Sequence, residues 1–180
     1  MPPFASDFQQ DYFQLFDVAP SFRMDTAQLE RQYRALQAQV HPDKFAHLSD
    51  AEQRVALQRA TLVNEAYQTL RSPIRRARYL LSLHGVDTQE ESDTAMPVDF
   101  LMAQMEWREA VAEAQQARDV AALERIEARV QHETRELEYG LAVTIDTEHD
   151  YAAAAGLVRK LRFTEKLAEE IHTAFDEIDT

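Results

Sequence analysis

The side chains of this sequence that could do chemistry gather in one short segment, which contains His41, Asp43 and His47. Imidazole and carboxylate groups this close could act as a general acid and base or bind a metal ion. Helical metal motifs often place two histidines four residues apart, but the six histidines, at 41, 47, 84, 132, 149 and 172, include no such pair. No third strong ligand stands at helical spacing nearby. The sequence therefore disfavours a metal site, and a metal-dependent hydrolase using His41 and Asp43 remains as the catalytic alternative.

The same segment has the features of a docking loop. Residues 41–45 read His-Pro-Asp-Lys-Phe. Pro42 holds its own φ at about −65° and disfavours helical geometry at His41, so the preceding helix must end there. Two polar side chains are then presented on a rigid corner. The simpler alternative is that His41 caps a helix and Asp43 satisfies local backbone donors.

Two helices must position this loop. Asp25 with Gln28, and Ser49 with Glu52, have the spacing of N-cap and N3 pairs, and Ser72-Pro73 suits the start of a third helix. Each of the first two segments has one apolar face: Leu29, Tyr33, Leu36 and Val40 in the first, and Ala56, Ala60, Val63, Tyr67 and Leu70 in the second. We expect an antiparallel helix pair with short flanking helices, including one over Asp11–Phe16, as an N-terminal domain spanning residues 1–84.

A second domain is expected after a polar linker at residues 85–96. One helix should start near Pro97, and the next would carry Leu123, Ile126, Val130, Leu137, Leu141 and Ile145 on one face. Thr147 with Asp150 has the spacing of a capping box for a last long helix. Its predicted core face is Leu157, Leu161, Ala168, Ile171, Phe175 and Ile178, with Leu167 at the edge. Residues 97–180 should form a three-helix bundle, and the fold class should be all-α.

The helix from Pro97 has two apolar faces. At about 100° per residue, one side carries Phe100, Gln104, Trp107 and Val111, and the nearly opposite side carries Val98, Leu101, Met102 and Met105. The second face is bordered by Glu106, Glu109 and Glu113. We expect the first face to pack and the second to bind a partner. The alternative is that the second face is also buried and the glutamates form an ordinary solvated surface.

Composition excludes several classes of protein and site. Only 3 glycines and 6 prolines favour helix nearly everywhere, and the absence of cysteine excludes disulfides, thiolate zinc sites and Cys-ligated iron–sulfur clusters within this chain. A net charge of −13 argues against nucleic acid as a partner. With no Lys or Arg before Arg23 and no long apolar run, we expect no signal peptide and no membrane span, and thus a cytoplasmic protein.

Three motifs, in order, resemble a J-domain. They are Asp11-Tyr12-Phe13, the loop from His41 to Phe45, and the segment from Asn64 to Leu70 followed by Ser72-Pro73. The continuation from Arg78 to Gly85 and the helical C-terminal half resemble the HscB co-chaperones of iron–sulfur cluster biogenesis. The likeness spans nearly the whole chain. Some eukaryotic members carry a cysteine-rich segment resembling a zinc site, so this cysteine-free chain looks more like the bacterial form, with no metal or cofactor.

The resemblance implies an HscA-like seventy-kilodalton heat-shock chaperone as one partner. J-domains bind such chaperones and stimulate their ATP hydrolysis through the His-Pro-Asp loop. The chaperone-binding residues implied here are His41, Pro42, Asp43, Arg31, Arg34 and Lys44. This basic patch is thinner than the lysine-rich helix of many J-domains.

The second implied partner is the iron–sulfur cluster scaffold protein, IscU-like, which the family binds with its C-terminal surface. The matching positions are Leu101, Met102, Met105, Glu106, Glu109, Glu113 and Phe163. The expected function is that of an adaptor, not itself an enzyme, which delivers the scaffold to the chaperone and accelerates its ATPase. A J-domain adaptor for an unrelated client is the alternative.

Overall fold

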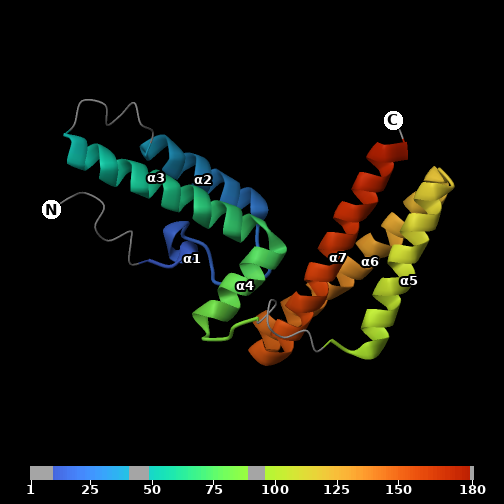
Figure 1. Cartoon of the computed structure of the whole chain (residues 1–180). Coiled ribbons are helices and arrows are strands. Elements are labelled where there is room, and N and C mark those ends of the chain that lie inside the picture. Colours follow the sequence, from blue (N-terminus) through green and yellow to red (C-terminus); the bar gives the residue numbers. More distant parts are fainter. Residues whose placement is uncertain (1–9, 41–48, 89–95, 179–180) are drawn as a thin grey trace. The chain divides into compact units, whose positions relative to one another are not determined.

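The computed structural model describes residues 10–40, 49–88 and 96–178. Within these ranges the chain is helical and contains no β-strand, which confirms the all-α prediction (Figure 1). The chain divides into two compact units, an N-terminal unit up to Leu80 and a C-terminal unit from Leu81. The division falls inside α4 (Pro73–Leu83).

The N-terminal unit is built around two helices, α2 (Thr26–Gln39) and α3 (Asp50–Arg71), which lie side by side and antiparallel (Figure 1). Both start at the predicted caps. The Asp25 carboxylate accepts hydrogen bonds from the backbone N–H groups of Ala27 and Gln28. Ser49 and Glu52 bond reciprocally as a capping box. Local side-chain chemistry thus fixes where each helix of the pair begins.

The core of the N-terminal unit joins this pair to the short helix α1 (Tyr12–Leu15) and to α4. Its largest fully buried side chains come from all of these elements: Phe13, Phe16, Leu29, Val63, Leu70 and Leu80. Across the pair, the rings of Tyr33 and Tyr67 stack with centroids 3.9 Å apart. The Tyr33 hydroxyl also donates to Asn64 Oδ1 at 2.8 Å. The α2–α3 pair is therefore held together by both apolar burial and a specific polar contact.

Arg76 ties the loop before α2 to the end of α3. It is buried, and its guanidinium donates to the carbonyl of Phe22 at 2.8 Å and to that of Leu70 at 2.6 Å. The same group lies 5.0 Å from the Phe22 ring centroid. A buried cation satisfied by backbone carbonyls acts as a structural bridge.

The C-terminal unit contains three long helices, α5 (Val98–Gln116), α6 (Val120–Val143) and α7 (Tyr151–Ile178), which form the predicted bundle (Figure 1). A π-helical turn, η3 (Thr144–Glu148), continues α6. All three helices contribute to one apolar core, made of Val111, Ala114, Leu123, Val130, Leu167, Ile171 and Ala174.

The predicted core face of α7 is wrong at two positions. Leu167 is fully buried in the core, whereas Ala168 is exposed. The buried line of the helix passes through Thr164, a polar residue that the apolar pattern skips. Its hydroxyl donates to the Leu161 carbonyl at 2.9 Å, so the side chain can be buried without an unsatisfied donor.

The predicted start of α7 is also wrong, by three residues. Thr147 belongs to η3, and the chain reverses at His149, whose φ is 55°. The N-cap is Asp150, whose Oδ1 atom accepts from the Ala153 N–H at 2.9 Å. The π-helical turn extends α6 past the point where the sequence pattern places a break.

Candidate functional site

The structure describes the two helix ends on either side of the predicted docking loop. His41, Pro42, Asp43 and Lys44 lie outside the described residues. On one side, the buried Val40 ends α2, with its N–H bonded to the Leu36 carbonyl at 3.1 Å. On the other side, the capping box described above starts α3. Both ends of the loop are therefore fixed to an ordered helix pair.

The basic residues predicted on α2 lie one turn apart and are both exposed. Arg34 forms an ion pair with Glu30 on the preceding turn, at 2.6 Å. Arg31 lies next to this pair on the exposed side of the helix. Because Glu30 offsets part of the charge, the basic surface of α2 is small.

The segment from Asn64 to Leu70 has a positioning role in this structure. Ala66 and Leu70 are fully buried, and Tyr67 stacks on Tyr33. These contacts hold the C-terminal part of α3 against α2, away from the end of the pair that carries the loop. The motif is therefore explained by packing inside the N-terminal unit.

The second apolar face of α5 is open to solvent. Val98, Met102 and Met105 are 70%, 58% and 71% exposed, whereas Gln104 and Val111 on the other side of the helix are buried. Leu101 is only partly buried. We call these four residues, Val98, Leu101, Met102 and Met105, the α5 strip. Isolated exposed apolar side chains are ordinary, but a continuous line of them marks an interaction surface.

Phe163 of α7 packs against α5. Its ring meets the edge of the Phe100 ring at a centroid distance of 5.5 Å and an interplanar angle of 75°. Phe163 is partly buried, and its ring contact is with Phe100, on the packing side of α5 and not on the strip itself. The Lys160 ammonium lies 5.5 Å from the Phe100 centroid, a contact that the sequence prediction missed. The sequence did contain a signal for this contact, because Lys160 lies three residues before Phe163 and therefore on the same side of α7.

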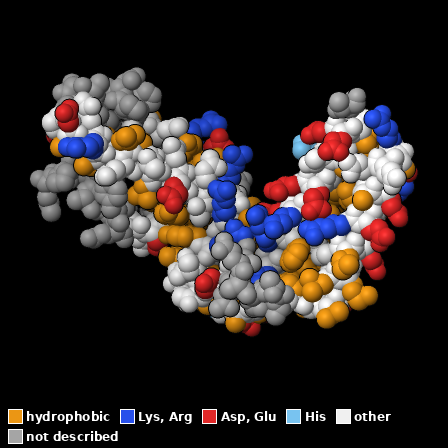
Figure 2. Space-filling view, viewed as in Figure 1, with side chains coloured by type: hydrophobic (Ala, Val, Ile, Leu, Met, Phe, Trp, Pro, Cys, Tyr) orange, Lys and Arg blue, Asp and Glu red, His pale blue; other side chains and the backbone are white. Residues whose placement is uncertain are grey.

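Acidic side chains border the strip along α5. Glu106, Glu109 and Glu113 are all exposed. Figure 2 shows hydrophobic side chains gathered at one end of the C-terminal unit, with acidic and basic side chains beside them. An apolar centre with charged borders has the composition of a protein-binding patch.

Metal-ligating side chains do not cluster in the described part of the chain. Within it, no three His, Cys, Asp or Glu side chains are placed to hold a metal ion. The hydrolase alternative built on His41 and Asp43 lies outside the described residues. Among the described helices none is both long and apolar enough to cross a membrane.

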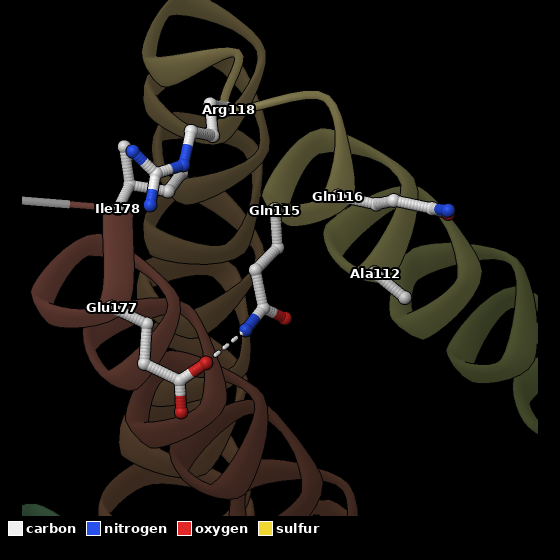
Figure 3. Close-up of a pocket in the computed structure, with 6 residues that line it drawn as sticks. All are labelled: Ala112, Gln115, Gln116, Arg118, Glu177 and Ile178. Atoms are coloured by element: carbon white, nitrogen blue, oxygen red, sulfur yellow. Dashed lines mark hydrogen bonds between the residues drawn. The ribbon is translucent and has the colours of Figure 1, made fainter. Parts of the chain in front are cut away.

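One cavity of about 360 Å³ lies where the ends of α5 and α7 meet (Figure 3). Gln115 donates a hydrogen bond to Glu177 across it, and Arg118 lies at its edge. Ala112, Gln116 and Ile178 complete its lining. This lining has one carboxylate and one guanidinium but no nucleophilic side chain, so it does not resemble an acid–base or nucleophilic site.

Comparison with known proteins gives matches to both halves of the chain. Residues 11–79 match the DnaJ domain, and residues 96–172 match the HSCB C-terminal oligomerisation domain. A protein of Aromatoleum aromaticum described as a co-chaperone protein HscB homolog is 51% identical, over 97% of this chain and 98% of its own. The Chromobacterium violaceum homolog is 55% identical, over 96% and 97%.

Solved structures agree with these matches. Chaperone HscB from Vibrio cholerae superimposes with a TM-score of 0.84 at 37% identity, over 94% of this chain and 99% of its own. The human co-chaperone protein HscB gives a TM-score of 0.86 at 37% identity, over 91% and 81%. The likeness therefore covers both units, in fold as well as in sequence.

Proposed function

Because this chain belongs to the HscB family of co-chaperones, we propose that it delivers the iron–sulfur cluster assembly scaffold to an HscA-like heat-shock chaperone. It binds the IscU-like scaffold with its C-terminal unit and stimulates the ATPase of the chaperone with its J-domain. It acts in the bacterial cytoplasm as an adaptor and performs no catalysis itself. The result is faster maturation of iron–sulfur proteins.

The observation that carries this proposal is the exposed α5 strip in the same chain as a J-domain. Met102 and Met105 are 58% and 71% exposed, outside the apolar core that the three helices form. Leaving such side chains in water forgoes about 1.5–3 kcal/mol each relative to full burial. A partner that covers the strip recovers part of this free energy. In the proposal, Leu101 and Phe163 extend the contact, and Glu106, Glu109 and Glu113 form its rim.

The chaperone contact is assigned to the loop after α2. Asp43 accepts a charge-assisted hydrogen bond from a chaperone arginine, and Pro42 reduces the entropy lost when the loop binds. Arg31, Arg34 and Lys44 face an acidic surface of the chaperone. The small basic surface of α2 supports binding to one specialised chaperone, because electrostatic attraction alone is weak here.

Stimulation of the chaperone is tested by single-turnover ATP hydrolysis. The HscA-like chaperone is mixed with this protein, with and without the scaffold, and His41→Gln serves as the loop variant. We expect the parent protein to accelerate hydrolysis, the scaffold to increase the acceleration, and His41→Gln to abolish it. No acceleration by a folded parent protein would refute the co-chaperone proposal.

Scaffold binding is tested by calorimetry with Met105→Glu. A carboxylate at the centre of the strip must be desolvated on binding, so we expect the affinity to fall by at least about 100-fold. Tyr139→Glu is the matched control, because Tyr139 is 64% exposed on α6 of the same unit. If the parent protein does not bind the scaffold at all, a J-domain adaptor for another client becomes the better reading.

A further inference from the structure

α5 and α7 run in parallel with one constant register. Phe100 meets Phe163, Arg108 pairs with Glu170 at 3.2 Å, and Gln115 bonds to Glu177. The partners in the last of these pairs are separated by 62 residues, and the other two pairs have nearly the same separation. A seam between the two helices therefore follows the whole length of α5.

This register places Lys166 level with the strip. Lys166 lies one turn after Phe163 and one turn before Glu170, and both of these side chains border the seam. At the same register, Met105 of α5 lies level with residues 166–168 of α7. Leu167 points into the core and is fully buried, whereas Lys166 is exposed. Lys166 is thus an exposed cation of α7 that lies level with Met105.

The surface around the strip has opposite charges on its two sides. Glu106, Glu109 and Glu113 project from the side of α5 away from α7, at helical angles about 100–160° from Arg108, which faces α7. On α7, Arg162 and Lys166 lie one turn apart. Arg162 forms an ion pair with Glu165 at 3.5 Å. Among the described residues, Lys166 has no carboxylate partner.

We propose that Lys166 is a specificity-determining contact to a carboxylate of the scaffold protein, so that the scaffold can dock in only one orientation. The inference rests on the proposed function and identifies the chemistry of the partner surface: an apolar patch with a basic group on one side and a carboxylate on the other. Charge complementarity at the rim of an interface selects partners and accelerates encounter more than it adds affinity.

The test compares two charge reversals in the full-length protein. Lys166→Glu should weaken binding of the scaffold about 10-fold, mainly through a slower association rate, because a favourable rim contact becomes repulsive. Arg135→Glu, at an exposed position on α6, is the control with the same change in net charge. Association and dissociation rates are measured by surface plasmon resonance at two salt concentrations, and thermal melting checks that each variant is folded.

Each outcome bears on the inference. A specific loss with Lys166→Glu that shrinks at high salt supports it, as does rescue by a single Asp→Lys or Glu→Lys change on the scaffold. Equal losses with Lys166→Glu and Arg135→Glu would mean that only net charge matters and would overturn it. Unchanged binding by Lys166→Glu overturns it and leaves the proposed function intact, whereas a parent protein that does not bind refutes both.

Discussion

Two stacked tyrosines attach the first helix to α4. The Tyr12 N–H donates to the Tyr79 hydroxyl at 2.9 Å, and the rings stack at 4.3 Å. Burial raises the pKa of Tyr12 above its ordinary value of 10.0, and the charge of Glu65 and a hydrogen bond to it raise the pKa further. Burial also raises the pKa of Tyr79, although the hydrogen bond from Tyr12 opposes this. The folded chain thus favours the neutral phenols.

This pair should make the protein sensitive to alkali. Above pH 10 or so the unfolded chain ionises its tyrosines first, so it binds fewer protons than the folded chain and stability falls as the pH rises. At neutral pH both states are protonated and the effect vanishes. We expect Tyr79→Phe to lose about 1 kcal/mol at pH 7, through the lost hydrogen bond, and to flatten the alkaline decline. Urea denaturation from pH 7 to 11 measures both, with Tyr139→Phe as the control. If the free energy of unfolding of Tyr79→Phe fell with pH as steeply as that of the parent protein, the alkaline sensitivity would not come from this tyrosine pair.

The C-terminal bundle contains a buried amide whose oxygen has no hydrogen-bond partner among the described residues. Gln104 is 3% exposed, and its Oε1 atom accepts no hydrogen bond within the described part of the chain. An unsatisfied buried acceptor is costly, so Gln104→Leu should raise the free energy of unfolding by about 1 kcal/mol. Urea denaturation followed by the fluorescence of Trp107, the one tryptophan, reports on this unit. If Gln104→Leu lowered the free energy of unfolding, the amide oxygen would have a water molecule as its partner. Gln104→Ala is the control that measures the cost of leaving the site empty.

At the scale of the helices, the start of α7 is a position where the capping-box spacing and the structure disagree: the spacing predicts Thr147 as the N-cap, and the structure has Asp150. Asp150→Ala should lower the free energy of unfolding by about 1 kcal/mol, because it removes the cap on the Ala153 N–H. Thr147→Ala should change it by less than about 0.5 kcal/mol. Both are measured by the same urea titration. The opposite ranking would show that the helix begins where the capping-box spacing placed it.

Helix starts were predictable where one side chain decides them. Asp25 and Ser49 cap their own helices, so the signal lies within four residues. The core face of α7 could not be predicted in this way, because it includes Thr164. This residue can be buried because its hydroxyl donates to the helix backbone and the three helices pack around it. A prediction from hydrophobic periodicity counts threonine as polar, so the predicted core face is shifted by one residue. It therefore includes Ala168, which is exposed, in place of Leu167, which is buried.

At the scale of the whole molecule, the candidate site depends both on the spacing of residues along α5 and on how α5 packs against α7. That Val98, Met102 and Met105 share one face of α5 could be predicted from their spacing, whereas the sequence left open whether this face is buried, and only the packed bundle shows it exposed. The contribution of α7 could not be predicted, because the level of Lys166 relative to Met105 depends on the register of two helices that are some sixty residues apart in the chain. Local patterns carry no information on that register.

The proposed mechanism also requires both units in one chain, and this can be tested in trans. Asp43→Asn should disable the loop while leaving the strip intact, and Met105→Glu should do the reverse. An equal mixture of the two variants should not restore scaffold-enhanced ATP hydrolysis at micromolar concentrations. A covalent link gives an effective concentration of scaffold at the chaperone in the millimolar range, and separate chains lose this advantage. Single-turnover hydrolysis measures the result against the parent protein. Full restoration by the mixture would show that the units act independently, in which case the chain carries two activities without coupling them.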